Sequence, residues 1–201
     1  MNANQNKLSY NNFLEMPLIP HKIIEYLFAS ESEVAENVWK LLNYNDIDCL
    51  NKPNLTQSEK AKLRWVGSPK QETFKIFIKP TISDGLGNAD KCNILKIYRT
   101  RTQPNNDLSA TIDIRFDIIT NETNSLVKYN GVYCERLDVL EACLLSLFNG
   151  KDIGVGYMEF SPMSSRLAQS NLKLGDNLHF YGRSITFGLT YTKVDSGGKC
   201  G

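Results

Sequence analysis

The sequence predicts an α+β fold, in which an antiparallel sheet of about five strands carries one main helix packed across it. Three observations support this prediction. Two capped helical segments come first, three segments with alternating apolar and polar residues follow, and a strongly apolar helical segment then precedes two more strand-like segments. The expected order of elements is α-α-β-β-β-α-β-β.

The length of 201 residues fits one domain. Residues 1–20 begin with an Asn-rich stretch without periodicity, so we expect a flexible arm. Residues 21–194 are expected to form a single α+β domain, with a helical lead-in over 21–66 and a sheet–helix core over 72–194. Residues 195–201 are expected to be a disordered tail.

Two capping signals place the two helices of the lead-in. Ser30 stands three residues before Glu33, which predicts a helix of about 12 residues starting just after Ser30. Thr56 and Glu59 repeat the pattern and predict a second, short helix that ends near Trp65. Apolar residues at helical spacing precede the first box: Ile23, Ile24, Leu27 and Phe28.

Residues 109–120, SATIDIRFDIIT, show the clearest strand pattern. Successive side chains of a strand point to opposite faces, so one face of this strand is expected to join a core. Residues 73–80 and 93–102 alternate less regularly. Turn residues in the links predict an antiparallel meander. The apolar parity of the clearest strand consists of Ala110, Ile112, Ile114, Phe116 and Ile118.

Residues 135–150, ERLDVLEACLLSLFNG, predict the main helix, because their leucines fall on one broad face. Gly150 follows its end, where a left-handed residue is favoured. Residues 153–160 and 183–194 then read as strands. The connection between them, residues 161–180, is long for a compact domain and is expected to be functional or mobile.

The charge balance is close to neutral, with 23 Lys and Arg against 22 Asp and Glu. A dedicated nucleic-acid binder normally has an excess of positive charge, so this class is disfavoured, although a local basic patch is compatible with the balance. Basic residues do gather around the second strand. Four of them are candidate DNA-facing residues: Lys91, Lys96, Arg99 and Arg101.

Little in the sequence points to catalysis, a cofactor or a metal. Five cysteines without a close C-x-x-C pair, beside only two histidines, predict reduced thiols in a cytosolic protein. Gly85 and Gly87 belong to a loop that fits neither a P-loop nor an EF-hand, so a turn is expected. The segment 154–157 is half of a dinucleotide fingerprint and is interpreted as a close-packed strand start. His179, with Asp176 nearest to it, is the one candidate base.

The N-terminus is polar, and no apolar run approaches the length of about 18 residues that a membrane helix needs. We therefore expect a soluble protein made in a cytoplasm, with no membrane partner.

The order of elements resembles the tail-terminator family of tailed phages. The resemblance covers roughly residues 30–194, from the leading helix through "FKIFIKP", "CNILKIYRTRT" and "SATIDIRFDII" to "RLDVLEACLLSLF", "IGVGYMEF" and "SITFGLTYT". The Asn-rich composition and extra N-terminal helices are most similar to neck ring proteins of crAss-like phages. The resemblance implies no catalytic residues. It implies a virion protein, assembled in the host cytoplasm as a ring of six or twelve copies, with neck, portal-side or tail proteins as neighbours and DNA passing through its lumen.

Such a ring needs subunit contacts, for which the loops 81–91 and 161–180 are candidates. The polar parity of residues 109–120 is another, although its charged residues can instead pair across strands or face water. The candidate interface residues are Asp113, Arg115, Asp117, Arg166, Leu172 and Lys173. Two alternatives remain open: a nucleic-acid-binding accessory protein that uses the Lys91–Arg101 patch, and a small enzyme that uses His179.

Overall fold

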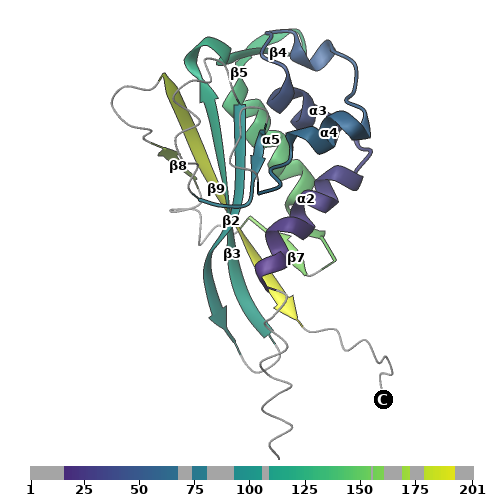
Figure 1. The fold of residues 1–201 in the computed structure, drawn as a ribbon. Coiled ribbons are helices and arrows are strands. Elements are labelled where there is room, and N and C mark those ends of the chain that lie inside the picture. Colours follow the sequence, from purple (N-terminus) through teal and green to yellow (C-terminus); the bar gives the residue numbers. More distant parts are fainter. Residues whose placement is uncertain are drawn as a thin grey trace, which may run out of the picture.

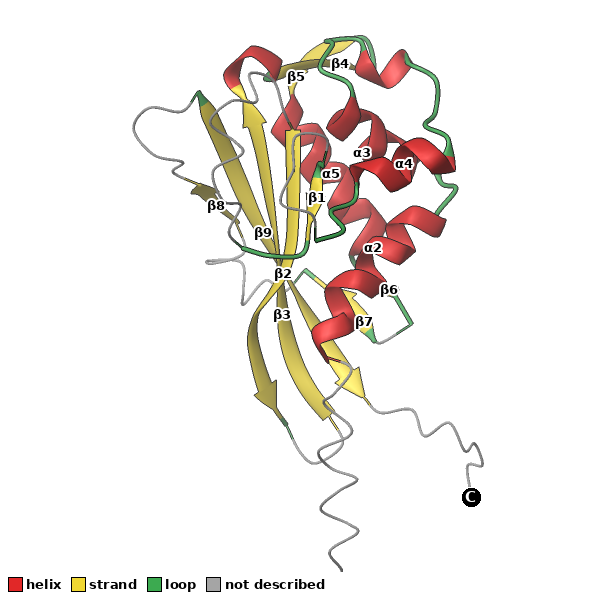
Figure 2. Cartoon of the chain, in the orientation of Figure 1, coloured by secondary structure: helices red, strands yellow, loops and turns green. Residues whose placement is uncertain are grey.

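The computed structural model describes residues 16–67, 74–80, 93–105, 109–154, 156–160, 169–172 and 179–192. It confirms the α+β fold: the α-helices of these ranges lie together on one side of a long sheet (Figures 1 and 2). The α-helices are α2 (Ile19–Ala29), α3 (Glu33–Asn43), α4 (Gln57–Leu63) and α5 (Arg136–Phe148). Short 3-10 helices are η1 (Met16–Leu18), η2 (Cys49–Asn51) and η4 (Glu122–Asn124).

The main sheet has seven strands in the described part of the chain, in the order β1-β2-β3-β9-β7-β6, with β8 also paired to β9. A separate two-stranded sheet joins β4 and β5. The strands of the main sheet are β1 (Ile76–Phe77), β2 (Asn93–Pro104), β3 (Ser109–Asn121), β6 (Lys151–Asp152), β7 (Tyr157–Glu159), β8 (Gln169–Leu172) and β9 (Phe180–Thr192). The small sheet consists of β4 (Leu126–Tyr129) and β5 (Val132–Glu135).

The predicted apolar parity of β3 is confirmed, because its five side chains are fully buried on the helix side of the sheet. Phe116 lies at its centre, with ring centroids 5.3 Å from Phe148 of α5 and 5.2 Å from Phe187 of β9. The main helix is also confirmed, and Gly150 follows it with a left-handed φ of 69°.

Three α-helices precede the sheet where the sequence predicts two. The apolar segment before Ser30 forms its own helix, α2, and the next helix begins later than predicted. Its N-cap is Ser32, whose Oγ accepts from Ala35 N at 3.2 Å, while Ser30 Oγ contacts Ser32 Oγ at 3.0 Å. The capping box of α4 is confirmed, with Thr56 and Glu59 as predicted.

The predicted antiparallel meander is wrong at its first strand. β1 has two residues and runs parallel to β2. Trp65 N donates to Ile76 O at 2.9 Å, and Lys75 N donates to Leu63 O at 2.8 Å. β1 is therefore held between the end of α4 and the edge of β2, and the alternation of residues 73–80 alone does not encode that placement.

The connections also hold more structure than expected. The polar segment before the main helix contains η4 and the β4–β5 hairpin, and the long connection 161–180 contains β8. The interpretation of 154–157 as a close-packed strand start is confirmed at Gly156, where a Cβ would collide with Thr190 O.

Some predictions fall outside the described residues: positions 1–15 of the arm, the tail 195–201 and the loop 81–91, which includes Gly85 and Gly87. Met16 and Ile19, the start of the described chain, are buried in the core.

Candidate functional site

Asp117, the last charged residue of the polar row on β3, is only 2% exposed. Its Oδ1 accepts hydrogen bonds from Ser184 Oγ at 2.5 Å and from Arg115 Nε at 2.8 Å, and its Oδ2 accepts one from the Tyr98 hydroxyl at 2.8 Å. Arg115 Nη2 also donates to Ser184 Oγ at 2.7 Å. Asp117 thus pairs with β2, β3 and β9 of its own chain, as the cross-strand alternative expects.

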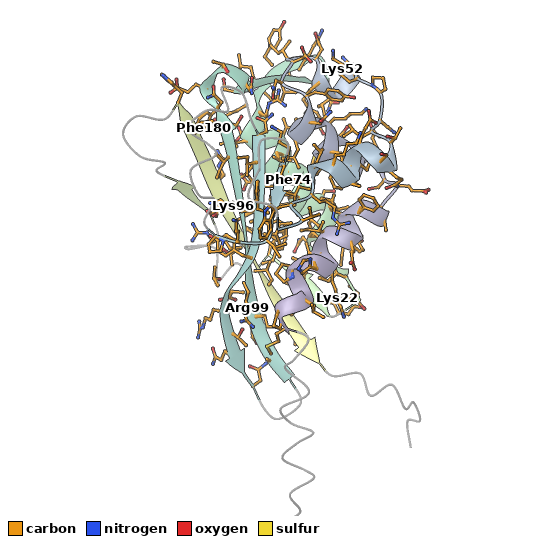
Figure 3. All side chains as sticks on the ribbon, viewed as in Figure 1. Lys22, Lys52, Phe74, Lys96, Arg99 and Phe180 are labelled. Carbon is orange, nitrogen blue, oxygen red and sulfur yellow. The ribbon has the colours of Figure 1, made fainter. Side chains whose placement is uncertain are left out.

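Lys96 completes this polar cluster on the side of the sheet away from the helices (Figure 3). Its Nζ lies 3.6 Å from Asp117 Oδ2 and donates to Pro80 O at 2.8 Å. The residue is buried. Its amine is therefore engaged within the chain, which leaves it little reach toward a DNA phosphate.

The electrostatics of the cluster favour a fixed charge. Burial alone would raise the pKa of Asp117, but the hydrogen bonds from Ser184, Arg115 and Tyr98, with the Arg115 charge, outweigh it and lower that pKa. Burial, together with the hydrogen bond to Asp117 and its charge, raises the pKa of Tyr98 to about 12. At neutral pH the cluster holds a carboxylate and a neutral phenol, both already hydrogen-bonded, which is an arrangement that stabilises a sheet.

A β-bulge at Thr100 separates the two arginines of β2. Arg99 is opposite Ile114, whereas Arg101 is opposite Asp113. Ile114 belongs to the buried parity and Asp113 to the other, so the bulge turns the arginines to opposite faces of the sheet.

The three described DNA-facing candidates therefore do not form one patch. Arg99 Nη1 lies 3.8 Å from Met16 Sδ on the helix side. Lys96 and Arg101 share the outer face but pair with β3 residues four positions apart, a separation of about 13 Å. Lys91 lies outside the described residues.

The remaining interface candidates are placed only in part. Asp113 is half-buried opposite Arg101, and the Arg115 side chain is 31% exposed. Leu172 ends β8, where its backbone pairs with Gly182. Arg166 and Lys173 lie outside the described residues.

His179, the candidate base, is exposed just before β9. Its Nδ1 lies 3.3 Å from Glu122 Oε2, and the two side chains are 80% and 67% exposed. Asp176 lies outside the described residues. An exposed pair in high dielectric is typical of a weak surface contact.

The described cysteines are Cys49, Cys134 and Cys143, all free thiols. Burial raises the pKa of Cys49, and it raises that of Cys143 to about 11, so both stay protonated at neutral pH. Within the described ranges, no three His, Cys, Asp or Glu side chains gather as a metal would require. Cys92 and Cys200 lie outside those ranges.

The sequence analysis missed an exposed apolar surface on and beside the β4–β5 hairpin. Among the described residues, eight large apolar side chains are exposed, and five of them lie here. We call this surface the apolar hairpin end; it consists of Ile47 (40% exposed), Leu126 (51%), Tyr129 (37%), Val132 (60%) and Tyr133 (69%). The dipeptide Asn130–Gly131 between two alternating segments is a strong hairpin signal that could have revealed it.

A fully buried arginine, Arg136, fixes the base of this hairpin. Its Nε donates to Asn124 O at 2.7 Å, just before β4, and its backbone N donates to Ser125 O at 2.6 Å. Its other nitrogens donate to carbonyl oxygens at the end of α3 and in the following loop: Leu41 (3.0 Å), Tyr44 (3.0 Å), Asn45 (3.4 Å) and Asp46 (3.1 Å). The C-terminal end of a helix carries partial negative charge, which favours a cation there.

A second exposed feature lies at the other end of the molecule, where β2, β3 and β9 extend past the helices (Figures 1 and 2). β1 pairs only with Leu95 and Lys96 of β2. Among the described residues, no strand pairs with β2 beyond Lys96 on that side. We call residues 97–103 the free β2 edge; Arg99 and Arg101 are exposed along it.

The described surfaces thus define an α+β protein whose exposed features are strand edges and an apolar hairpin. The chain matches the family model YomW over residues 35–189, from α3 into β9. It therefore belongs to the YomW family, a phage-associated family, and is a phage-related protein. No curated protein and no solved structure matches the chain. None of the helices in the described ranges has the length and hydropathy that a membrane span requires.

Proposed function

We propose that the chain is a structural protein of the virion neck. It forms a homo-oligomeric ring of six or twelve copies that joins the head and portal assembly to the tail or terminates the tail tube. Genomic DNA passes through the lumen without sequence-specific contacts, and the protein acts by assembly, not as an enzyme. Membership of a phage-associated family and the resemblance to tail terminators support this proposal.

The observation that carries the proposal is the presence of two unlike exposed surfaces at opposite ends of one molecule (Figure 1). The apolar hairpin end lies at one end, and the free β2 edge with Arg99 and Arg101 lies at the other. A closed ring uses heterologous contacts, so each subunit must offer two different surfaces to its two neighbours. A monomeric protein has no such requirement.

The outer face of the sheet adds a third surface for neighbouring neck proteins. Asp113 and Arg115 keep their candidate role there, because both side chains are partly exposed. Asp117 supports that surface from beneath, since its carboxylate holds the Arg115 guanidinium. Arg166, Leu172 and Lys173 remain proposed interface residues.

The test is deletion of the gene in the phage, with electron microscopy of the resulting particles and protein analysis of purified wild-type virions. We expect the protein in wild-type virions, and we expect the deletion to yield DNA-filled heads separated from tails, or tails of irregular length. Expression of the wild-type chain from a plasmid should restore joined particles. Absence of the protein from purified virions, or normal particles after deletion, would contradict the proposal.

A further inference from the structure

The hairpin has one outer edge that is used and one that no strand of the described ranges occupies. On β4, Lys128 N donates to Ile47 O at 2.8 Å, so that edge already has a partner. The hairpin closes with Tyr129 opposite Val132 through a two-residue turn. In this register alternate residues hydrogen-bond across the pair, so the N–H and C=O of Tyr133 point away from β4. β5 can therefore accept another strand.

An aromatic ring lies on each face of the hairpin, Tyr133 on the open edge and Tyr129 on β4. Tyr133 is opposite Lys128, and Tyr129 is opposite Val132. Neighbouring positions of a strand alternate between faces, so Tyr129 and Tyr133, on adjacent cross-strand pairs, lie on opposite faces.

The free β2 edge has the complementary arrangement. The bulge at Thr100 directs Arg99 to the helix side and Arg101 to the outer side, so a cation lies on each face of this edge. Guanidinium groups stack favourably on aromatic faces, and Tyr and Arg are among the residues enriched at the centres of protein interfaces.

Pairing of the free β2 edge with itself gives the arginines no partner. In an antiparallel pair centred on Thr100, Arg99 of one copy would lie opposite Arg101 of the other, and these two side chains point to opposite faces of the sheet. The bulge and Pro104 also restrict the length of strand that can pair here. A short strand such as β5 (Val132–Glu135) meets that restriction.

We infer that β5 of one copy adds to the free β2 edge of a second copy, with Tyr133 stacked on Arg101 on one face and Tyr129 of β4 in reach of Arg99, across Val132, on the other. The occupant of the apolar hairpin end is thus another molecule of this chain, bound by its opposite end. Each copy can then engage two neighbours at once, which is what ring closure requires. The closure into a ring rests on the proposed function, whereas the pairwise contact does not.

The first experiment measures self-association of the full chain by sedimentation velocity over a wide range of concentration. We expect the wild-type protein to associate. Tyr133→Lys brings a cation against the arginines, and Arg101→Glu removes the cation that the tyrosine contacts. Each change should raise the dissociation constant by about 30-fold or more, the effect of losing a central interface residue. Tyr157→Lys is the matched control, because Tyr157 is likewise exposed (60%, against 69% for Tyr133) but lies on β7, and it should associate like the wild type.

The second experiment mixes the two defective proteins in equal amounts. Tyr133→Lys retains an intact β2 edge, and Arg101→Glu retains an intact hairpin, so one of each should pair with nearly wild-type affinity. The hairpin of the Tyr133→Lys protein can also meet the β2 edge of the Arg101→Glu protein. In that pairing the introduced lysine and the introduced glutamate attract each other. A mixture that stays dissociated, an Arg101→Glu protein that associates like the wild type, or a wild-type protein that stays monomeric at millimolar concentration would overturn the inference.

These outcomes are independent of the test of function. Virions that contain the protein, combined with variants that associate normally, would reject this contact and leave the neck proposal intact. The expected association behaviour in a protein absent from virions would keep the contact and reject the neck role. Circular dichroism and urea unfolding of each variant separate loss of contact from loss of fold.

Discussion

Arg136 and Asp117 are both buried charges, yet the protein compensates them in different ways. Arg136 has five backbone carbonyl oxygens within hydrogen-bonding distance, together with the Cys49 sulfur at 3.4 Å, and none of these acceptors is a carboxylate. Asp117 instead lies between Arg115 and Lys96 and accepts bonds from two hydroxyl groups. Backbone dipoles of a helix end and a loop compensate the charge of Arg136, whereas the charged side chains of Arg115 and Lys96 compensate that of Asp117.

The difference shows which region is a rigid scaffold and which can respond to its surroundings. Carbonyl groups do not titrate, so the Arg136 region keeps its bonds at every ordinary pH. The Asp117 region depends on a carboxylate that can be protonated and on Arg115, whose side chain is partly exposed to solvent and salt. The hydrogen bonds that anchor the hairpin are therefore independent of pH and salt, whereas those on the outer face of the sheet depend on both.

Arg136→Met should have the largest effect on this comparison. It leaves buried carbonyl oxygens of α3 and the following loop without donors, and we expect a loss of about 3–5 kcal/mol in the free energy of unfolding, measured with urea. Amide exchange at Val127 and Cys134 should also accelerate, because Arg136 anchors the start of β4.

Arg136→Lys is the control that separates charge from geometry. It retains the positive charge but offers three rotatable donors in place of a planar fork of five N–H groups. We expect it to recover only part of the lost stability. Full recovery would show that charge at the end of α3 suffices and that the fork is unimportant.

Asp117→Asn should have a smaller effect. It leaves Arg115 and Lys96 without their counter-charge and disturbs two hydroxyl donors, and we expect a loss of about 1–3 kcal/mol. The loss is limited because Arg115 can turn toward solvent. Asp113→Asn, on the same parity of β3, should stay within about 0.5 kcal/mol. An equal effect of both changes in urea unfolding would refute the distinction between the buried and exposed parts of the row.

The sequence predicts the parts of this comparison that depend on local pattern. The parity of β3, the main helix and the Thr56–Glu59 capping box are local features and are correctly predicted. The burial of Asp117 depends on Ser184, which is far away in the chain and reaches it only through the β3–β9 register. The bulge at Thr100 likewise depends on pairing with β3, and it breaks the two-residue spacing that made Arg99 and Arg101 look like one patch.

The β4–β5 hairpin, in contrast, could have been predicted, since its sequence signal is local. Asn130 and Gly131 both have positive φ, at 50° and 85°, as the turn that joins two adjacent strands requires. The anchoring of the hairpin by Arg136 could not be predicted, because the carbonyl oxygens of Tyr44 and Asn45 that accept from Arg136 lie about ninety residues before it in the chain.

Acidification should weaken the Asp117 region selectively. The folded-state pKa of Asp117 lies below its ordinary value of 3.8, so its contribution to stability is complete above that value and is lost as the pH falls through the folded-state pKa. The difference in unfolding free energy between wild type and Asp117→Asn should therefore shrink as the pH approaches and passes below 3.8. The difference between wild type and Arg136→Met should stay constant over the same range. A gap for Asp117→Asn that does not change with pH would contradict the assignment.

Tyr98→Phe should have the smallest effect and is the most specific probe of the network. It removes one of the hydroxyl donors to Asp117 while keeping the ring, so the expected loss at neutral pH is about 1 kcal/mol. The tyrosine hydrogen bond helps to lower the pKa of Asp117, and its removal should raise that pKa toward the ordinary value of 3.8, so the acid-induced loss of stability should be smaller than in the wild type and complete at a higher pH. Tyr133→Phe is the control, because it removes a phenol hydroxyl from the exposed hairpin, outside the Asp117 network. It should leave the acid transition unchanged. If the two variants shift the transition equally, the shift reflects a general effect of losing a phenol, and Asp117 is not the titrating group.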